Sequence, residues 1–196
     1  IKDKRFFQFN FSFLIKKDYL IAIQKFSAMA LLSAIIVPLT LLLIRNNITA
    51  GYSLPEAGLW EATTKLSSFY MHFFNAGLSL YYMPKLASLQ TESEFKQELM
   101  GYFSTFVPLF LIMLLVLFFV KEWVLELIFT TEFLKIKSVL IWQFIGDFFK
   151  IITLAFGYQI LVKARLKVYF FLEIAFNVSY LLLSFFWIKT QGYEGA

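Results

Sequence analysis

The sequence contains no cysteine and only one histidine, His72. A disulfide framework is therefore excluded, and so is any site that needs a pair of histidines. The chain also lacks a glycine-rich phosphate loop, a cluster of metal-ligand residues and a nucleophile beside a base. We accordingly expect no enzyme activity, no cofactor, no metal site and no nucleic-acid partner.

Charge is also scarce, because only 16% of the 196 residues are charged while 60% are hydrophobic and 20% are aromatic. A soluble domain of this length carries about 25% charged residues, so this composition indicates an integral membrane protein. The 26 phenylalanines and four tryptophans suit surfaces that face lipid or lie at its interface.

Hydrophobic segments of about 20 residues, the length that crosses a bilayer, occur five times. We expect an all-α polytopic protein with spans near residues 20–44, 57–82, 103–121, 139–162 and 167–188. The second span is the weakest, because it carries many polar residues. We interpret residues 1–19 as an interfacial linker and residues 20–196 as one five-span domain.

Lysine and arginine are concentrated before span one, after span two and after span four. The positive-inside rule places these three regions in the cytoplasm, so the first residue is cytoplasmic and the last lies on the opposite side. Residues 121–138 mix acidic, basic and apolar side chains. This mixture predicts a short helix on the outer surface.

An acid and a base occur inside span four, where Asp147 and Lys150 are three residues apart. Each costs on the order of 3 kcal/mol to insert at the bilayer centre, so a partner or a polar pathway is expected. The spacing places both on one helical face. Two interpretations follow: an ion pair that only joins helices, or part of a lined pathway.

Polar residues also follow one stripe of span two at spacings of three and four. They are Glu61, Lys65, Ser68, His72, Asn75 and Ser79. A stripe along a whole span must face neighbouring helices or water, so a hydrated cavity and polar contacts between helices are the alternatives. His72 is either a proton relay or, more commonly, a residue that only forms a hydrogen bond.

Span five repeats this pattern with Tyr169, Glu173, Asn177, Tyr180 and Ser184. Lys25 in span one and Lys65 and Lys150 in spans two and four are the cations within the spans, whereas Glu61, Asp147 and Glu173 are the acids. Several fixed cations in a polar cavity would attract an anionic group. Pro38 and Pro108 are candidates for helix kinks.

Four sequence blocks resemble the Wzx-type oligosaccharide flippases of the MOP exporter superfamily, above all the branch that serves enterobacterial common antigen. The blocks are residues 25–38 with Arg45 and Asn46, 58–61, 142–150 and 156–164. Such flippases have about twelve helices in two lobes, so the chain resembles helices seven to eleven. The N-terminal lobe and the last helix are then expected outside this chain.

The resemblance implies alternating-access transfer of an undecaprenyl-pyrophosphate-linked oligosaccharide across the bacterial inner membrane. It would serve O-antigen or enterobacterial common antigen biosynthesis, beside a glycan polymerase and a chain-length regulator. The pyrophosphate would bind Lys25, Arg45, Lys65 and Lys150. The sugars would bind Asn75, Gln143, Tyr158, Asn177 and Tyr180. Charge pairing or ion coupling would involve Glu61, Asp147 and Glu173.

Three rival functions remain open at this point. A multidrug exporter of the same superfamily would need an excess of unpaired acids in its cavity. A membrane-embedded glycan polymerase or ligase would need a large outer loop with catalytic arginine or histidine. A membrane scaffold would use the polar stripes only to join helices.

Overall fold

A computed structural model describes residues 17–196, which form five long helices and two short 3₁₀ helices. The long helices are α1 (Lys17–Gly51), α2 (Leu54–Ser88), α3 (Glu92–Ile128), α4 (Leu140–Val162) and α5 (Leu166–Gln191). The short ones are η1 (Thr131–Ser138) and η2 (Gly192–Gly195). No strand occurs among these residues, and the all-α prediction is confirmed. Most of the predicted linker, residues 1–16, lies outside the described residues.

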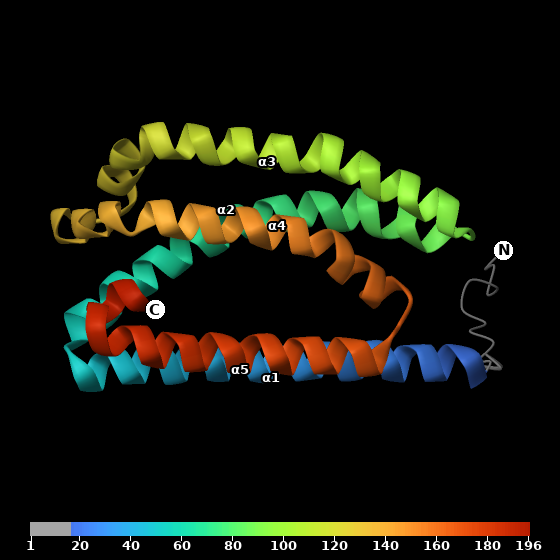
Figure 1. The fold of residues 1–196 in the computed structure, drawn as a ribbon, viewed down its shortest axis with the longest axis horizontal. Coiled ribbons are helices and arrows are strands. Elements are labelled where there is room, and N and C mark those ends of the chain that lie inside the picture. The colour runs from blue at the N-terminus through green and yellow to red at the C-terminus, as the bar shows by residue number, and fades with distance from the viewer. Residues whose placement is uncertain (1–16) are drawn as a thin grey trace, which may run out of the picture.

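Each predicted span matches one long helix, with only Val139 of the fourth span outside, and consecutive helices run in opposite directions (Figure 1). Within the described part of the chain, α1, α3, α4 and α5 are long and apolar enough to cross a membrane. α2 has 35 residues and is long enough to cross a membrane, but its polar stripe makes it less hydrophobic than the other four helices. The fold is thus that of a polytopic membrane protein.

The prediction of one separate surface helix over residues 121–138 is wrong. α3 continues to Ile128, and η1 follows only at Thr131. At 1.5 Å per residue, the 37 residues of α3 extend well beyond a bilayer core of about 30 Å. The acidic and basic residues in its last turns therefore belong to the same helix as the span.

Capping residues in the turns before α2 and α3 determine where these two helices begin. The Ser53 side chain accepts a hydrogen bond from the Glu56 backbone N–H and caps α2. Thr91 and Glu94 form a reciprocal capping box at the start of α3. These short connections make consecutive helices antiparallel neighbours.

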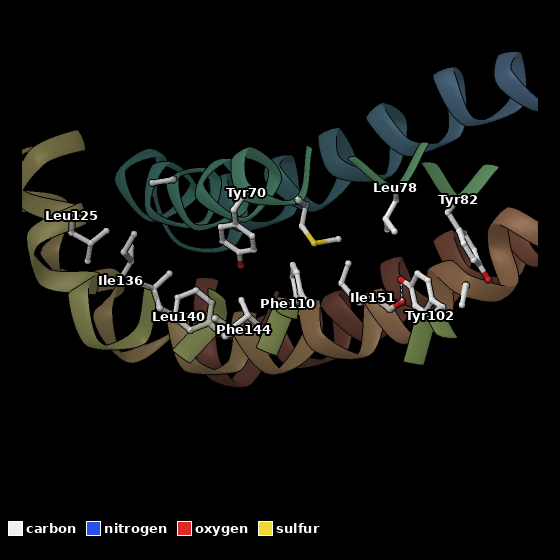
Figure 2. Packing of buried hydrophobic residues seen from close by; sticks show 14 of the residues in the cluster. Tyr70, Leu78, Tyr82, Tyr102, Phe110, Leu125, Ile136, Leu140, Phe144 and Ile151 are labelled. Carbon is white, nitrogen blue, oxygen red and sulfur yellow. Dashed lines mark hydrogen bonds between the residues drawn. The ribbon is translucent and has the colours of Figure 1, made fainter. Parts of the chain in front are cut away.

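Two hydrophobic clusters divide the helices into two groups. The larger cluster joins α2, α3, η1 and α4, and Tyr70, Phe110, Phe144 and Ile151 lie in it (Figure 2). The smaller cluster joins the last turns of α1, the first turns of α2 and the end of α5. In Figure 1, α1 and α5 run side by side in the same direction. α2 leaves this pair at one end, and at the other end the last turns of α4 bend toward it and lead into α5.

Many large apolar side chains remain on the outside of these groups. Phe73, Phe119, Trp123 and Leu127 are all at least 80% exposed. Exposed apolar surface on this scale is unfavourable in water and normal against lipid acyl chains. The surface chemistry therefore agrees with the span assignment.

Candidate functional site

Three charged residues connect α1 to α2 where the two helix groups meet. Arg45 Nε lies 3.7 Å from Glu61 Oε2, and Lys65 Nζ lies 3.9 Å from Glu61 Oε1. One carboxylate thus faces two cations, which leaves a net charge of about +1 on this charged triad of Arg45, Glu61 and Lys65. An anion can bind there without displacing Glu61, because one cation is in excess.

The triad lies beside the smaller hydrophobic cluster. Trp60, which precedes Glu61, packs with Ile44, Ile48 and Ala57 in that cluster. This packing fixes the backbone on both sides of the ion pairs. The side chains stay partly accessible, since those of Arg45, Glu61 and Lys65 are 42%, 37% and 73% exposed. The Arg45 Nε atom itself is buried and has no hydrogen-bond partner in the described residues.

Asp147 is the most deeply buried of the predicted site residues, with 2% of its surface exposed. Its Oδ2 atom accepts hydrogen bonds from Ser67 Oγ at 2.6 Å, from the Tyr70 hydroxyl and from Gln143 Nε2 at 3.2 Å. Three donors on one oxygen satisfy a buried carboxylate and tie α4 to α2. Asp147 is therefore an interhelical acceptor in this arrangement.

Lys150 does not pair with Asp147, which excludes the ion pair, one of the two interpretations of their spacing. The buried edge of α4 consists of Leu140, Phe144, Asp147, Ile151 and Ala155. Lys150 lies just beside this edge and is exposed, and within residues 17–196 it forms no ion pair. Three helical residues turn the chain by about 300°, so neighbouring positions can lie on opposite sides of a packing boundary.

The polar residues of α5 mostly contact α1 or lie in the packed interior. Ser33 Oγ donates to Glu173 Oε1 at 2.8 Å and lies 2.6 Å from the Tyr169 hydroxyl. Asn177 is buried, and its Nδ2 atom donates to the Glu173 carbonyl oxygen. Polar contacts between helices, one of the two alternatives, therefore describe this part of α5. Tyr180 packs beside the smaller cluster.

The stripe on α2 behaves differently. Its six residues are exposed or half-buried, whereas the buried residues of α2 follow a neighbouring face that includes Ser67, Tyr70 and Met71. His72 Nδ1 contacts the Ser68 carbonyl oxygen at 2.6 Å, which is a bond within α2. Apart from Glu61, which pairs with Arg45 of α1, the side chains of the stripe form no hydrogen bond or ion pair with another helix in the described residues. They are left for water, ligand or another part of the protein.

Two further predicted residues meet between α2 and α4. The Tyr158 hydroxyl donates to the Asn75 carbonyl oxygen at 3.5 Å, and the buried Asn75 Oδ1 atom has no partner in the described residues. Lys25 is exposed near the start of α1 and lies apart from these groups along the chain. No group of His, Asp or Glu within residues 17–196 is arranged to hold a metal ion.

Cysteine labelling tests whether the α2 stripe faces water. Ser68→Cys, Asn75→Cys and Ser79→Cys should react with a membrane-impermeant maleimide at least tenfold faster than Leu78→Cys, because Leu78 is 1% exposed inside the larger cluster. The rates are measured on the full-length protein in membranes. Protection of all three stripe positions would show that the stripe is covered.

Comparison with curated proteins gives two relatives, both named lipid III flippase, from Escherichia coli (strain K12) and Shigella flexneri. Each is 25% identical to this chain over 174 residues, which is 89% of the chain and 42% of the relative. The chain is similar to lipid III flippases. The resemblance to oligosaccharide flippases is thereby confirmed, and the chain spans less than half the length of these relatives.

No protein-family model and no solved structure matches the chain. The aligned 174 residues still include most of the chain, so the similarity to the flippases is not confined to one motif. The residues around Asp147 were only partly foreseen from the sequence. Ser67 and Tyr70 lie just off the polar stripe and carry no charge, so periodicity alone did not single them out.

Proposed function

We propose that this chain forms part of a flippase that moves an undecaprenyl-pyrophosphate-linked oligosaccharide from the cytoplasmic to the periplasmic leaflet of a bacterial inner membrane. The similarity to lipid III flippases supports transport rather than enzyme activity, and supports enterobacterial common antigen as the glycan; O antigen is the second candidate. The observation that carries the proposal is the net positive triad of Arg45, Glu61 and Lys65 inside membrane-length helices.

A pyrophosphate headgroup needs cations that hold it without trapping it. At an effective dielectric constant near 20, one cation about 4 Å from a phosphate oxygen contributes roughly 4 kcal/mol before desolvation is subtracted. Arg45 also offers a planar guanidinium that can contact two phosphate oxygens at once. Glu61 keeps both cations in place and weakens their combined field, so that release remains possible.

The remaining predicted residues have different roles in this proposal: some would contact phosphate and others would contact sugars. Lys25 and Lys150 are exposed and supply further phosphate contacts along the path. Asn75, Gln143, Tyr158 and Tyr180 supply hydrogen bonds and stacking surfaces for sugars. Glu173 accepts a hydrogen bond from Ser33 of α1, and Asn177 is buried with its amide bonded within α5, so contact with a coupling ion or a sugar requires both side chains to leave these positions.

The five helices would form most of the C-terminal lobe, with the N-terminal lobe completing the cavity. Alternating access then consists of movement between the lobes around the headgroup. The first helix would start on the cytoplasmic side and α5 would end in the periplasm, following the distribution of lysine and arginine. A glycan polymerase and a chain-length regulator would act on the delivered glycan.

Complementation tests this function against the multidrug exporter. The full-length protein, expressed in a strain that lacks its lipid III flippase, should restore surface glycan, because the headgroup chemistry of the substrate matches the triad. It should not raise resistance to cationic dyes, since a net positive site repels them. Dye resistance without restored glycan would instead support the exporter.

A further inference from the structure

The turn between α4 and α5 carries a concentration of positive charge. Lys163, Arg165 and Lys167 occur within five residues, and all three side chains are exposed. None of them forms an ion pair with a residue in the described part of the chain. We refer to these three residues as the basic turn.

The backbone holds the basic turn in a defined conformation. The Arg165 N–H donates to the Ile160 carbonyl oxygen at 3.1 Å, and the Ala164 N–H donates to the Leu161 carbonyl oxygen at 2.9 Å. Ala164 has φ of 47°. Together these features form the Schellman type of helix end, with a left-handed residue after the last turn. The cations therefore project from a fixed loop.

The acids at the start of α3 neutralise the basic turn only in part. Lys163 Nζ lies 5.2 Å from the centre of the Phe95 ring, so the turn contacts the start of α3. There, Glu94 accepts hydrogen bonds from the backbone of Gln90 and Thr91, and Glu98 pairs with Lys85 at 2.6 Å. Glu92 and Glu94 form no ion pair in the described residues, and their two negative charges offset only part of the charge of the three cations.

The basic turn also lies where the apolar surface of the bundle ends. It is at the same end as the α2–α3 turn (Figure 1), near which the exposed Tyr81 contacts Lys85. Tyrosines in this position are typical of the membrane interface. Val168 and Phe171, which follow the turn in α5, are exposed apolar residues. The phosphate group of a lipid would lie level with the basic turn, and its first acyl carbons would lie level with Val168 and Phe171.

We infer that the basic turn is a binding site for the headgroup of an anionic glycerophospholipid. Arg165 can contact two phosphate oxygens, Lys163 and Lys167 add single charges, and the acyl chains lie along Val168 and Phe171. The bound lipid fixes this end of the α4–α5 connection at the membrane surface. The inference is independent of the proposed transport function, because it requires only that this end lies at a bilayer surface.

Native mass spectrometry of the purified full-length protein tests this site. The probes are phosphatidylglycerol and phosphatidylcholine with identical acyl chains. Each basic residue near an anionic headgroup contributes about a fivefold gain in affinity. The variant K163Q/R165Q/K167Q should thus bind phosphatidylglycerol at least tenfold more weakly, with binding of phosphatidylcholine unchanged. The matched control K135Q/K137Q/K189Q removes three cations elsewhere and should bind both lipids like the wild type.

Two outcomes would overturn the inference. Equal binding of phosphatidylglycerol by the wild type and the K163Q/R165Q/K167Q variant would show that the turn is not the site. Displacement of phosphatidylglycerol by equimolar undecaprenyl pyrophosphate would assign the turn to the transported lipid instead. Failure of complementation by the wild-type protein would affect only the transport proposal, since the lipid measurement does not depend on it.

Discussion

Replacement of Asp147 by alanine is expected to destabilise the protein by about 3 kcal/mol or more and to abolish surface glycan. The carboxylate accepts hydrogen bonds from Ser67, Tyr70 and Gln143, and all of these donors lose their acceptor in the variant. An unsatisfied buried polar group costs about 1–3 kcal/mol. The measurement is thermal unfolding of the purified full-length protein in detergent, together with surface glycan in cells.

Two matched variants separate this effect from a loss of charge. Asp147→Asn keeps one acceptor oxygen and the side-chain volume, so it should be destabilised less than Asp147→Ala. Lys150→Ala lies one turn away on the exposed side of α4 and should change stability by less than about 0.5 kcal/mol. Equal destabilisation by Lys150→Ala and Asp147→Ala would restore the discarded pairing of these two residues.

Removal of both cations of the charged triad is the second large perturbation. The double variant Arg45→Gln and Lys65→Gln leaves Glu61 without either partner, so the local charge changes from about +1 to −1. An anionic headgroup is then repelled where it was attracted, and we expect at least a hundredfold loss of glycan export. Export is measured as surface glycan at matched protein levels in the membrane.

The control for this double variant keeps both positive charges and exchanges the guanidinium and ammonium groups that carry them. Arg45→Lys and Lys65→Arg preserve both cations and should retain most of the export. Lys135→Gln removes an exposed cation on η1, away from the triad, and should have no effect. Wild-type export by Arg45→Gln and Lys65→Gln together would exclude the triad from headgroup binding.

The helices of this protein could be predicted because the bilayer imposes a length on hydrophobic segments. Apart from Val139, all five expected spans fall within α1 to α5. The helix ends were less predictable, since α3 runs past the expected end of its span to Ile128. Hydropathy detects where a helix is in lipid, whereas helix propensity and packing decide how far it continues beyond the lipid.

The polar residues of the spans could be identified from the sequence, but the residues that they contact could not. Periodicity identified the stripes on α2 and α5, yet it could not show that the α5 residues face α1 through Ser33 while the α2 stripe stays free. The partners of Asp147 also depend on how α2 and α4 cross. That crossing is set by side-chain packing in the larger cluster, including Tyr70 and Phe144, and not by either helix alone.

The central claim is that the triad of Arg45, Glu61 and Lys65 binds the anionic headgroup of the transported lipid. The most direct test is transfer of a fluorescent undecaprenyl-pyrophosphate-linked sugar across proteoliposomes that contain the full-length protein. We predict transfer by the wild type, retention of transfer in the Arg45→Lys variant, and no transfer in the double variant Arg45→Gln and Lys65→Gln. Equal transfer rates in the wild type and the double variant would contradict the claim.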